Sequence, residues 1–484
     1  MAALPEYKDS MSRPTSIPQH IWEDLSTEAQ AVIAGVIGHL EQQIADLKEQ
    51  LNKNSTNSSK PPSTDPPAVK RRPLTTPSGK RRGGQPGHRR HCRPLVPPEQ
   101  VHEAVVCKPA HCRRCGHGLA GEDPQPLLHQ VAEIPPVQPV VTEYRLHRLS
   151  CPHCGTSTCG TLPLGVPTGA FGPRLHAMLS LLAGAYRLGQ RPIQQLARDL
   201  FRLSISQGMI AKLRRQTAAV LESPVTELRE HVRRAPVAHI DETSWREDRT
   251  KAWLWVALTP LVTVFTIAAT RCGGVARQVL GEVARRVVVS DRFSSYGWIE
   301  LRQFCWAHLR RDFQAMIDRG GASAEVGRRL LDHSNKLFHW WHRVRDGTMA
   351  RATLKGYTDP LRWAVRQDLR RGAECSCAKT AATCRELLEG EAHLWTFLRV
   401  AGVDPTNNAA ERALRHAVIW RKTSGGTEGD SGSPFVERML SVVATCRQQG
   451  RNILEYLVAC QEAHLLGHPA PSLLPKEAAR SSVA

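Results

Sequence analysis

The stretch between Asp241 and Asp291 constrains the fold of this chain most, because short apolar runs and charged stops alternate along it. A first run, PVAHID, ends at Asp241, and a last run, RRVVVSD, ends at Asp291. Short apolar runs that are bounded by turn residues are typical of buried strands. After the first strand, we expect strands over Lys251–Leu258 and Val262–Ala268, a helix over roughly Gly274–Arg285 and a strand over Val287–Ser290. The pattern predicts an α/β domain.

One section of this stretch needs a separate argument, because Ala252–Thr270 carries no charge and is long enough for a membrane helix. Pro260 divides it, and both halves are rich in β-branched and aromatic residues. We therefore expect two buried strands and no membrane segment. The N-terminal residues also lack the apolar core of a signal peptide.

Asp241 and Asp291 are predicted to close the first and the fourth strand. This strand order, with acids at those two ends, is the ribonuclease-H-like arrangement. Carboxylates on a rigid sheet edge can be positioned closely enough to bridge two metal ions ~3.5–4 Å apart. Glu242 directly follows Asp241, and alternation along a strand sends the two side chains to opposite faces. Only one of them can therefore face such a site.

A third acid is expected after a long helical stretch. Residues from about Asp312 to Leu398 read as helices and are too many for a loop, which predicts an inserted helical subdomain. The segment DPTNNAAERALRHAVIWRKT then returns the chain to the core, with Glu411 just inside a helix that Asn407 or Asn408 can cap. Asp404 competes for this role, and an ion pair with Arg415 is the alternative for Glu411.

The charge of the chain indicates a polyanionic partner. Lys and Arg number 65 against 45 Asp and Glu, which gives a formal net charge of +20. Such an excess favours nucleic acid, and a basic ribosome-associated protein is the alternative. Converging carboxylates in a basic protein indicate a divalent-metal site that acts on a phosphate backbone.

The N-terminal region combines a helical seam with a basic linker. Apolar residues recur at alternating spacings of four and three: Ile33, Ile37, Leu40, Ile44, Leu47 and Leu51. This pattern favours a short coiled coil between two copies of the chain, and a helix packed on its own chain is the alternative. The following residues are rich in Pro, Ser, Lys and Arg, and their clusters KRR, GKRR and HRR can lie along phosphates. A solubilising linker is the alternative.

Two CxxC units predict a structural zinc site, with Cys112, Cys115, Cys151 and Cys154 as tetrahedral thiolate ligands. A glycine follows each pair, as a tight knuckle turn requires. We expect a hairpin over residues 129–149 to fill the interval between the pairs. Reduced thiols are the alternative, and nearby residues compete for a ligand position: Cys107, His111, His117 and Cys159.

The segment RPIQQLARDLFRLSISQGMIAKLRRQ reads as helix, turn and helix, with Ser204 or Ser206 as the second N-cap. A DNA-reading helix-turn-helix would place Lys212, Arg214 and Arg215 on its second helix. An ordinary helical hairpin is the alternative.

Several motifs together resemble the insertion-sequence-66 family of DDE transposases. They are NSTNSSKPPSTD, GGQPGH, the double CxxC, HIDETSWR, VSDRFSSY, CWAHLRR, NNAAERALR with WRKTSGGT, and FVERMLSVVATCRQQGRNILEYL. The resemblance implies a ribonuclease-H-like core with an inserted domain. It also implies that Asp241, Asp291 and Glu411 form the metal-binding triad, in preference to Glu242 and Asp404. Ser244 replaces the proline usual after DET, and TSGGTEGDSGSPF replaces a commoner aromatic-rich stretch.

From these observations we expect an α/β multidomain transposase that cleaves the ends of an insertion sequence and joins the 3′-OH to target DNA. A ribonuclease-H-like nuclease or resolvase and a transposase-derived DNA-binding regulator are the alternatives. The expected regions are a coiled-coil helix (22–52), a basic linker (53–100), a zinc-binding domain (101–160), a helix-turn-helix-like domain (161–235), a first segment of the catalytic core (236–311), a helical insertion (312–400), a second segment of the core with the third acid (401–425) and a C-terminal helical region (426–484).

The expected cofactors are two Mg²⁺ (or Mn²⁺) ions per active site, bridged by Asp241, and a structural Zn²⁺. The expected partners are double-stranded DNA, further copies of the chain and accessory proteins of the same element, in the cytoplasm at the bacterial nucleoid. His308 is expected to support the site. The residues expected to contact phosphates near it are Arg412, Arg415, Arg421 and Lys422.

Overall fold

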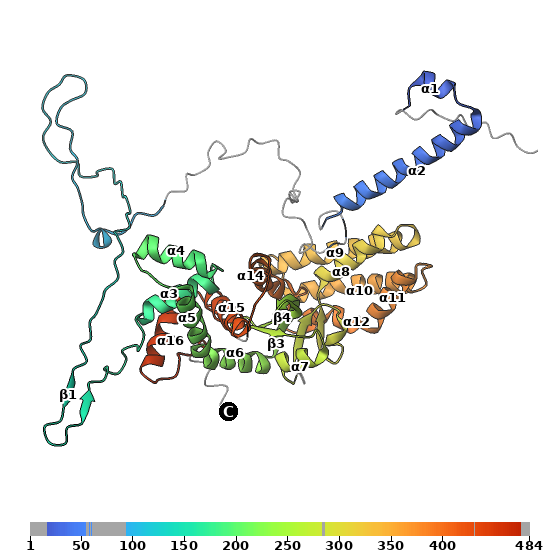
Figure 1. Ribbon diagram of the computed structural model, residues 1–484. Helices are drawn as coiled ribbons and strands as arrows, with labels where there is room; N and C mark the ends of the chain where they lie inside the picture. Colours follow the sequence, from blue (N-terminus) through green and yellow to red (C-terminus); the bar gives the residue numbers. More distant parts are fainter. Residues whose placement is uncertain are drawn as a thin grey trace, which may run out of the picture.

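A computed structural model describes residues 17–54, 58, 60, 93–282, 286–429 and 431–475. The KRR, GKRR and HRR clusters of the expected linker lie outside the described residues. Figure 1 shows an α/β body from which helix α2 (Thr27–Asn52) and the segment around strand β1 (Arg148–Ser150) project. Within the described ranges, no helix is both long and apolar enough to cross a membrane.

The body is organised around a sheet of five strands in the order β5–β4–β3–β6–β7. The pairs β3–β4 and β4–β5 are antiparallel, whereas β3–β6 and β6–β7 are parallel. The strands are β3 (Val237–Glu247), β4 (Thr250–Leu258), β5 (Thr263–Ala268), β6 (Val287–Ser290) and β7 (Arg302–Phe304). The uncharged stretch therefore forms two strands, as expected. Strand β7 was not predicted, because three residues are too few to show a period.

The expectation that a strand ends at Asp241 is wrong, because β3 continues for six more residues to Glu247. These residues pair with β4, from Asp241 opposite Val256 to Glu247 opposite Thr250. Asp248 and Arg249, both at positive φ, close this hairpin as a two-residue loop of that kind requires. The antiparallel partner thus holds the polar second half of β3 in the sheet.

The helix between β5 and β6 is also shorter than expected. Helix α7 spans Gly273–Leu280. Gly281 follows at a φ of 69°, outside the helical range, and its N–H bonds to the carbonyl of Arg277. A glycine in this conformation is a common helix stop.

Helix α15 (Gly432–Gln448) covers the free edge of the sheet at β5. The hydroxyls of Thr445 and Ser441 accept hydrogen bonds from the backbone N–H groups of Thr263 (3.1 Å) and Phe265 (2.9 Å). Four residues of helix rise about 6 Å and two of strand about 6.6 Å, so the spacings match. The edge is therefore closed to pairing with another chain.

The other helices around this sheet complete the first hydrophobic core. Helix α14 (Asn408–Ser424) lies against β3 and β4. The remaining helices are α3 (Pro173–Gly184), α4 (Gln190–Phe201), α5 (Gln207–Val220), α6 (Glu222–Arg234) and α16 (Ile453–Leu465). Trp245, Trp255 and Phe265 are fully buried in this region.

A second hydrophobic core belongs to the helices between β7 and α14. They are α8 (Trp306–Asp318), α9 (Gly321–Arg345), α10 (Arg351–Ala373), α11 (Ala378–Glu389), α12 (Glu391–Leu394) and α13 (Thr396–Arg399). This core meets the sheet at Val289 and Phe304. The backbone N–H of Trp306 bonds to the carbonyl of Pro405 at 3.0 Å, so the chain leaves and re-enters the sheet region at one point.

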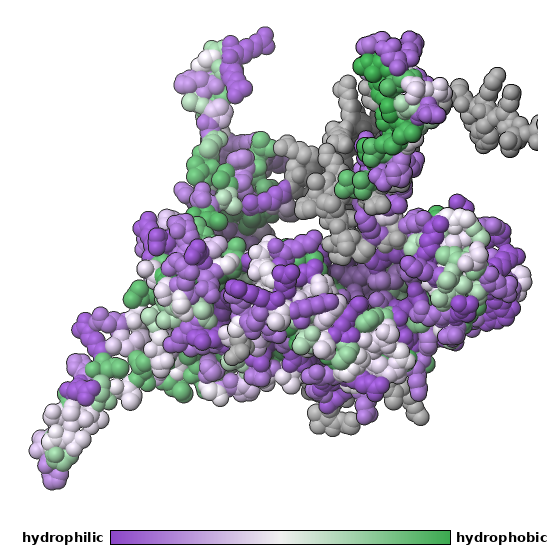
Figure 2. Space-filling model, turned by 45° about the vertical axis from the view of Figure 1, so that its right-hand side comes forward, coloured by the Kyte–Doolittle hydropathy of each residue, from purple (hydrophilic) through white to green (hydrophobic). Residues whose placement is uncertain are grey.

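The N-terminal elements bury little of their surface. Helix α1 spans Gln19–Glu23, and the expected seam residues of α2 include Leu40, Ile44 and Leu47, which are about half exposed at 49%, 49% and 57%. Figure 2 shows apolar residues running along this helix.

After the 3₁₀ turn Pro98–Gln100, β1 pairs with β2 (Ser157–Cys159). The expected hairpin over residues 129–149 is wrong, because the paired strands flank the second CxxC instead.

Candidate active site

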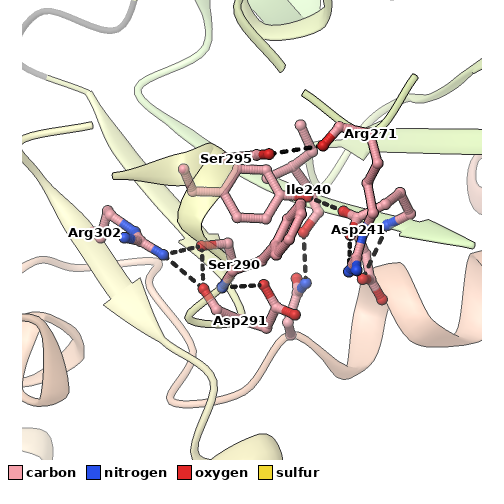
Figure 3. A network of polar contacts seen from close by, with 11 residues as sticks. Ile240, Asp241, Arg271, Ser290, Asp291, Ser295 and Arg302 are labelled. Carbon is pink, nitrogen blue, oxygen red and sulfur yellow. Dashed lines mark hydrogen bonds and ion pairs between the residues drawn. The ribbon is translucent and has the colours of Figure 1, made fainter. Parts of the chain in front are cut away.

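Asp241 and Asp291 lie side by side on parallel strands. The last pair of the β3–β6 ladder is His239 with Val289, and the same register continued by two residues puts Asp241 level with Asp291. The charge of Asp291 raises the pKa of Asp241, which agrees with this proximity. Strand β6 ends at Ser290, so Asp291 stands where the parallel pairing stops. Figure 3 shows the two carboxylates and the polar network around them. Each is oriented by a backbone N–H: that of Glu242 donates to Asp241 (3.0 Å), and that of Phe293 donates to Asp291 (2.9 Å).

A buried arginine holds the end of β6 in place. The guanidinium of Arg302 donates to the carbonyl oxygen of Asp291 at 2.7 Å and to the hydroxyl of Ser290 at 3.2 Å (Figure 3). The guanidinium also lies over the ring of Phe304, with 4.7 Å from its carbon to the ring centre. Burial lowers the pKa of Arg302 to about 10, which leaves it charged at neutral pH. Sequence reasoning missed this residue, because nothing in its spacing separates it from other arginines.

Glu411 joins the site from the first turn of α14. Its Oε1 atom lies 3.3 Å from His308 Nδ1 and 3.5 Å from Arg311. Both Oε1 of Glu411 and Nδ1 of His308 are buried without a hydrogen-bond partner in the described structure. The expected alternative, an ion pair between Glu411 and Arg415, does not occur among the described contacts. Arg311 was missed, although it stands in the same CWAHLRR motif as His308.

The start of α14 is tied to β3 by a buried asparagine. Asn407 is fully buried, and its side-chain amide donates to the carbonyl of Ile240 at 2.7 Å. Its side-chain oxygen lies 3.0 Å from Nδ1 of His239, and its backbone N–H contacts Cys305 Sγ at 3.0 Å. Asn407 is the N-cap residue, but its side chain makes no capping bond. Its role is thus to connect the helix to the strand.

The three carboxylates share one electrostatic environment. Burial raises the pKa of Asp241 well above its ordinary value of 3.8, and the negative charges of Glu242, Asp291 and Glu411 raise it further. Burial is also the main cause of the raised pKa of Glu411, which Asp291 raises and Arg311 lowers. Carboxylates that destabilise one another in this way are the arrangement that a divalent cation relieves. The unpartnered Oε1 of Glu411 fits the same ligand role.

Glu242, the neighbour of Asp241, belongs to a different network on the other face of β3. Its side chain is fully buried, and Arg271 and the hydroxyl of Tyr296 contact the carboxylate. Arg271 is itself held between the rings of Phe293 (3.7 Å) and Trp253 (4.9 Å). Every oxygen of Glu242 thus has a partner, which leaves this acid for support of the strand.

Asp404, the other competitor, lies exposed in the loop before α14. Burial lowers the pKa of His239, and the charge of Asp404 raises that pKa by a smaller amount.

The residues around Glu411 include two further side chains of metal-ligand type. His308, Cys305 and Glu411 offer ligand atoms within 4.8 Å of one another. Burial lowers the pKa of His308 to about 4 and raises that of Cys305 to about 12, so both are neutral near pH 7.

Comparison with known families decides the assignment. The family described as the transposase IS66 family matches residues 168–433, more than half of the chain, including all three acids. The chain belongs to the transposase IS66 family. The zinc-finger binding domain of transposase IS66 matches residues 109–155, and a family of unknown function matches residues 14–94. The chain is also similar to the uncharacterized protein y4hP of Sinorhizobium fredii, with 24% identity over 427 residues, 78% of this chain and 75% of that protein.

The zinc-finger region of this IS66-family chain contains two matching knuckles. In the first, the N–H of Cys112 bonds to the carbonyl of His117 (2.8 Å) and Gly116 adopts a φ of 73°. In the second, Cys151 bonds to Thr156 (2.9 Å) and Gly155 adopts a φ of 71°. Backbone hydrogen bonding lowers the pKa of Cys112, and a bond with Thr156 lowers that of Cys154.

The structure does not bring the two knuckles to one point. Among the described residues, the Cys305, His308 and Glu411 group is the one that gathers three ligand-type side chains within 4.8 Å. Cys112, Cys115, Cys151 and Cys154 are therefore separate pairs. Almost all of residues 101–160 is exposed, so little apolar burial is available to hold the pairs together. Small zinc domains depend on the metal bonds for this purpose.

The residues expected to contact DNA differ in how exposed their side chains are to solvent. Ser206 caps α5 by accepting from the N–H of Met209 (3.1 Å), and Arg202 ends α4 at a φ of 52°. Lys212 and Arg215 are exposed on α5, but Arg214 stacks over Phe435 at 4.5 Å, where burial lowers its pKa.

On α14, three of the four expected basic residues are exposed, namely Arg412, Arg415 and Lys422. Arg421 is half-buried and donates to the hydroxyl of Thr243 (3.2 Å) and to Ser244. The hydroxyl of Ser244, at the position where proline was expected, thus accepts a hydrogen bond from the guanidinium of Arg421. Arg421 serves the contact between α14 and β3 in this structure.

Proposed function

We propose that the chain is a DNA transposase that cleaves the ends of its own element and joins the freed 3′-OH to target DNA. The observation that supports the proposal most is the parallel register of β3 and β6, which, continued two residues beyond its last pair, brings Asp241 level with Asp291. Helix α14 adds Glu411 from a segment 120 residues later in the chain. Family membership supports the transposase role, and the acids support this particular chemistry.

We infer that the core is ribonuclease-H-like. The first three strands are antiparallel neighbours and the last two are added in parallel beside the first, which gives the order β5–β4–β3–β6–β7. A helical insertion between β7 and α14 supports the same inference, because it separates the third acid from the first two. The bond between Trp306 and Pro405 explains how such an insertion leaves the site intact.

The acid site fits two Mg²⁺ or Mn²⁺ ions. Oε1 of Glu411, which accepts no hydrogen bond from a described residue, and the carboxylates of Asp241 and Glu411, whose pKa values are raised, supply the hard, negatively charged oxygens that these cations prefer. Bound there, the ions would lower the pKa of an attacking water and stabilise the leaving 3′ oxygen.

The residues of the chain orient the reacting groups. Arg302 and Asn407 hold the strand end and the helix start on which the acids stand. Arg311 and neutral His308 keep Glu411 turned toward the site. Arg412 and Arg415 are exposed beside it and can neutralise the phosphates of the DNA strand.

A joining assay with a pre-cleaved element end that already carries a 3′-OH tests the proposal. Asp241→Asn, Asp291→Asn and Glu411→Gln should each reduce joining by at least about a thousandfold, a barrier increase of about 4 kcal/mol. Asp404→Asn is the matched control, because it removes an exposed acid three residues before Asn407. Retained joining by all three triad variants would refute the proposal.

The same assay separates the alternative functions. A nuclease or resolvase would cleave element ends without joining a supplied 3′-OH to unrelated target DNA. A DNA-binding regulator would bind the ends and do neither. The presence of all three acids in one electrostatic site favours an active enzyme over the regulator.

We further propose that the two knuckles share one tetrahedral Zn²⁺ through Cys112, Cys115, Cys151 and Cys154. Two matched knuckles and the zinc-finger match support this. We also propose that α2 pairs two copies of the chain, because four of its six seam residues are exposed, namely Leu40, Ile44, Leu47 and Leu51. Leu40→Lys should lower the oligomeric state in analytical ultracentrifugation, whereas Glu41→Lys, just off the seam, should not. An unchanged state for Leu40→Lys would exclude this role.

A further inference from the structure

A cavity of about 390 Å³ adjoins the proposed active site, where α14 and α15 meet the ends of α3, β4 and β5. Small-molecule sites in proteins begin at about 300 Å³. Alanine and valine side chains of α14 and α15 contribute to the lining, among them Ala409, Ala413, Val443 and Ala444. The basic residues in the lining are Arg187, Arg412, His416 and Arg447. The cavity thus combines small apolar side chains with three guanidiniums.

In the part of the chain that the structure describes, no acid lines the cavity itself, although the charge of Arg412 also acts on the neighbouring Glu411 and lowers its pKa. The lining contains no Asp or Glu, and within the described residues none of Arg187, Arg412 and Arg447 forms an ion pair. Arg292, by contrast, stands near other arginines but has a carboxylate partner in Asp312 (2.8 Å). Three guanidiniums around one cavity without an acid are an arrangement that an anion stabilises.

His416 cannot accept a hydrogen bond from both of the guanidiniums that approach it. Arg187 approaches its Nδ1 at 3.3 Å, and Arg447 approaches its Nε2 at 3.3 Å. A neutral imidazole has a single acceptor nitrogen, and a protonated one has none. At least one of the two guanidiniums therefore lacks an acceptor on His416 and has donors available for another group.

The backbone at Arg187 is held in an unfavourable conformation. Its φ is 61°, in the left-handed region that residues with a side chain seldom adopt. Such strain persists where surrounding structure imposes it, and it is frequent at ligand sites. Here it directs the guanidinium of a residue just after α3 to His416 on α14.

The cavity and the acid site share one helix. Arg412 directly follows Glu411, and successive residues of a helix point about 100° apart. Glu411 faces His308 and Arg311, whereas Arg412 lines the cavity. A strand that is bound at the acids can therefore reach the cavity within a few nucleotides.

We propose that this cavity binds one nucleotide phosphate of the DNA strand held at the active site, through Arg187, Arg412 and Arg447, with the sugar or base against the alanine and valine side chains of the lining. The assignment to DNA rests on the proposed function. The shared chemistry is that of a nucleotide phosphate, which a free mononucleotide also offers, so the test has an arm for each source.

The test measures binding without chemistry, in full-length Asp291→Asn protein, by fluorescence anisotropy of a labelled element-end duplex at several salt concentrations. Arg187→Gln and Arg447→Gln should each weaken binding about three- to tenfold and reduce the slope of log affinity against log salt by about 0.9, one phosphate contact. Arg370→Gln, an exposed arginine on α10, should change neither.

The second arm titrates deoxyadenosine monophosphate and inorganic phosphate into the same proteins by calorimetry. Loss of mononucleotide binding in the two variants, with duplex binding unchanged, supports the phosphate site but assigns it to a free nucleotide. Unchanged binding of both ligands in both variants overturns the inference. If Arg447→Gln fails to fold, Ala413→Leu, which fills the cavity without removing a charge, takes its place with the same expected losses.

Failure of the inference and failure of the proposed function give different results. DNA joining by the wild-type protein with unchanged binding in the cavity variants would refute the cavity alone. Absence of joining with reduced binding in those variants would refute the transposase chemistry and leave the phosphate site standing.

Discussion

The side-chain amide of Asn407 donates a 2.7 Å hydrogen bond to the carbonyl oxygen of Ile240, the residue before Asp241. This contact joins the first turn of α14 to β3 across 167 positions of sequence. Because Glu411 lies one turn into α14, the bond sets the height of the third acid relative to the first. A buried amide therefore links the two halves of the site, in addition to the contact of Arg421 with Thr243 and Ser244.

Asn407→Ala should destabilise the fold by about 1–3 kcal/mol, because it leaves the carbonyl of Ile240 and the ring of His239 without partners. It should also raise the Mg²⁺ concentration needed for half-maximal joining about tenfold, since Glu411 is no longer held. Urea unfolding and a Mg²⁺ titration measure the two effects. Asn408→Ala, at the exposed next position, is the control. A change in stability alone would reduce Asn407 to a packing role.

Asp241→Asn should raise the melting temperature of the metal-free protein near neutral pH. The pKa of Asp241 is raised in the folded state, so its contribution to stability is full below 3.8 and is lost as pH rises through the higher folded pKa. Above pH 3.8 the folded protein must either keep a proton on Asp241 or hold a disfavoured carboxylate, and asparagine removes both costs. Differential scanning calorimetry between pH 5 and pH 8 checks this, and the gain should shrink toward pH 5.

With Mg²⁺, the wild-type protein should have a higher melting temperature than Asp241→Asn protein. Mg²⁺ binds the carboxylates of the folded wild-type protein and should raise its melting temperature with increasing concentration, whereas the melting temperature of Asp241→Asn protein should change little. Lower pH should weaken the wild-type response, because protons compete with the cation for the raised-pKa carboxylates. Equal responses of the two proteins to Mg²⁺ would show that Asp241 is no ligand.

Glu242→Gln should cost no more than about 1 kcal/mol of stability, because loss of the ion pair with Arg271 is offset by removal of a buried charge whose pKa burial raises. Joining per folded molecule should fall by less than tenfold, since both carboxylate oxygens of Glu242 already have partners in Arg271 and Tyr296. Urea unfolding and joining at a temperature well below the melting point measure these quantities. Glu300→Gln removes an exposed acid and serves as the control. Loss of joining in stably folded Glu242→Gln protein would place Glu242 in the site.

Cys151→Ser should abolish bound zinc without lowering the stability of the sheet domain by more than about 0.5 kcal/mol, the usual range for a surface change. The reason is that residues 101–160 contribute no side chain to either described hydrophobic core. Zinc analysis by mass spectrometry and calorimetry test it. Cys159→Ser, an exposed cysteine eight positions away, should retain zinc. Equal zinc loss in both variants would require a different ligand set.

Some elements were predictable because their information is local. The apolar run before Asp291 is a strand of the expected length, since Val287, Val288 and Val289 are buried on both faces. Ser206 caps α5 for reasons contained in four residues. Strand β3 was predicted too short for the opposite reason. Its second half is polar, and it is held by pairing with β4, which a local pattern does not show.

The sequence by itself determined the residue types of the site, the succession of the first four strands and the family, because apolar periodicity and short motifs are local properties of the chain. Only the tertiary structure decided which neighbours those residues have. In the folded protein, Glu242 contacts Arg271 and Tyr296, and Asn407 bonds to β3 instead of capping its helix. Arg214 packs on Phe435, and three arginines without a carboxylate ion pair among the described residues line one cavity. The physical reason is that burial and hydrogen bonding between distant segments set the pKa and the free donors of a side chain, and neither depends on its neighbours in sequence.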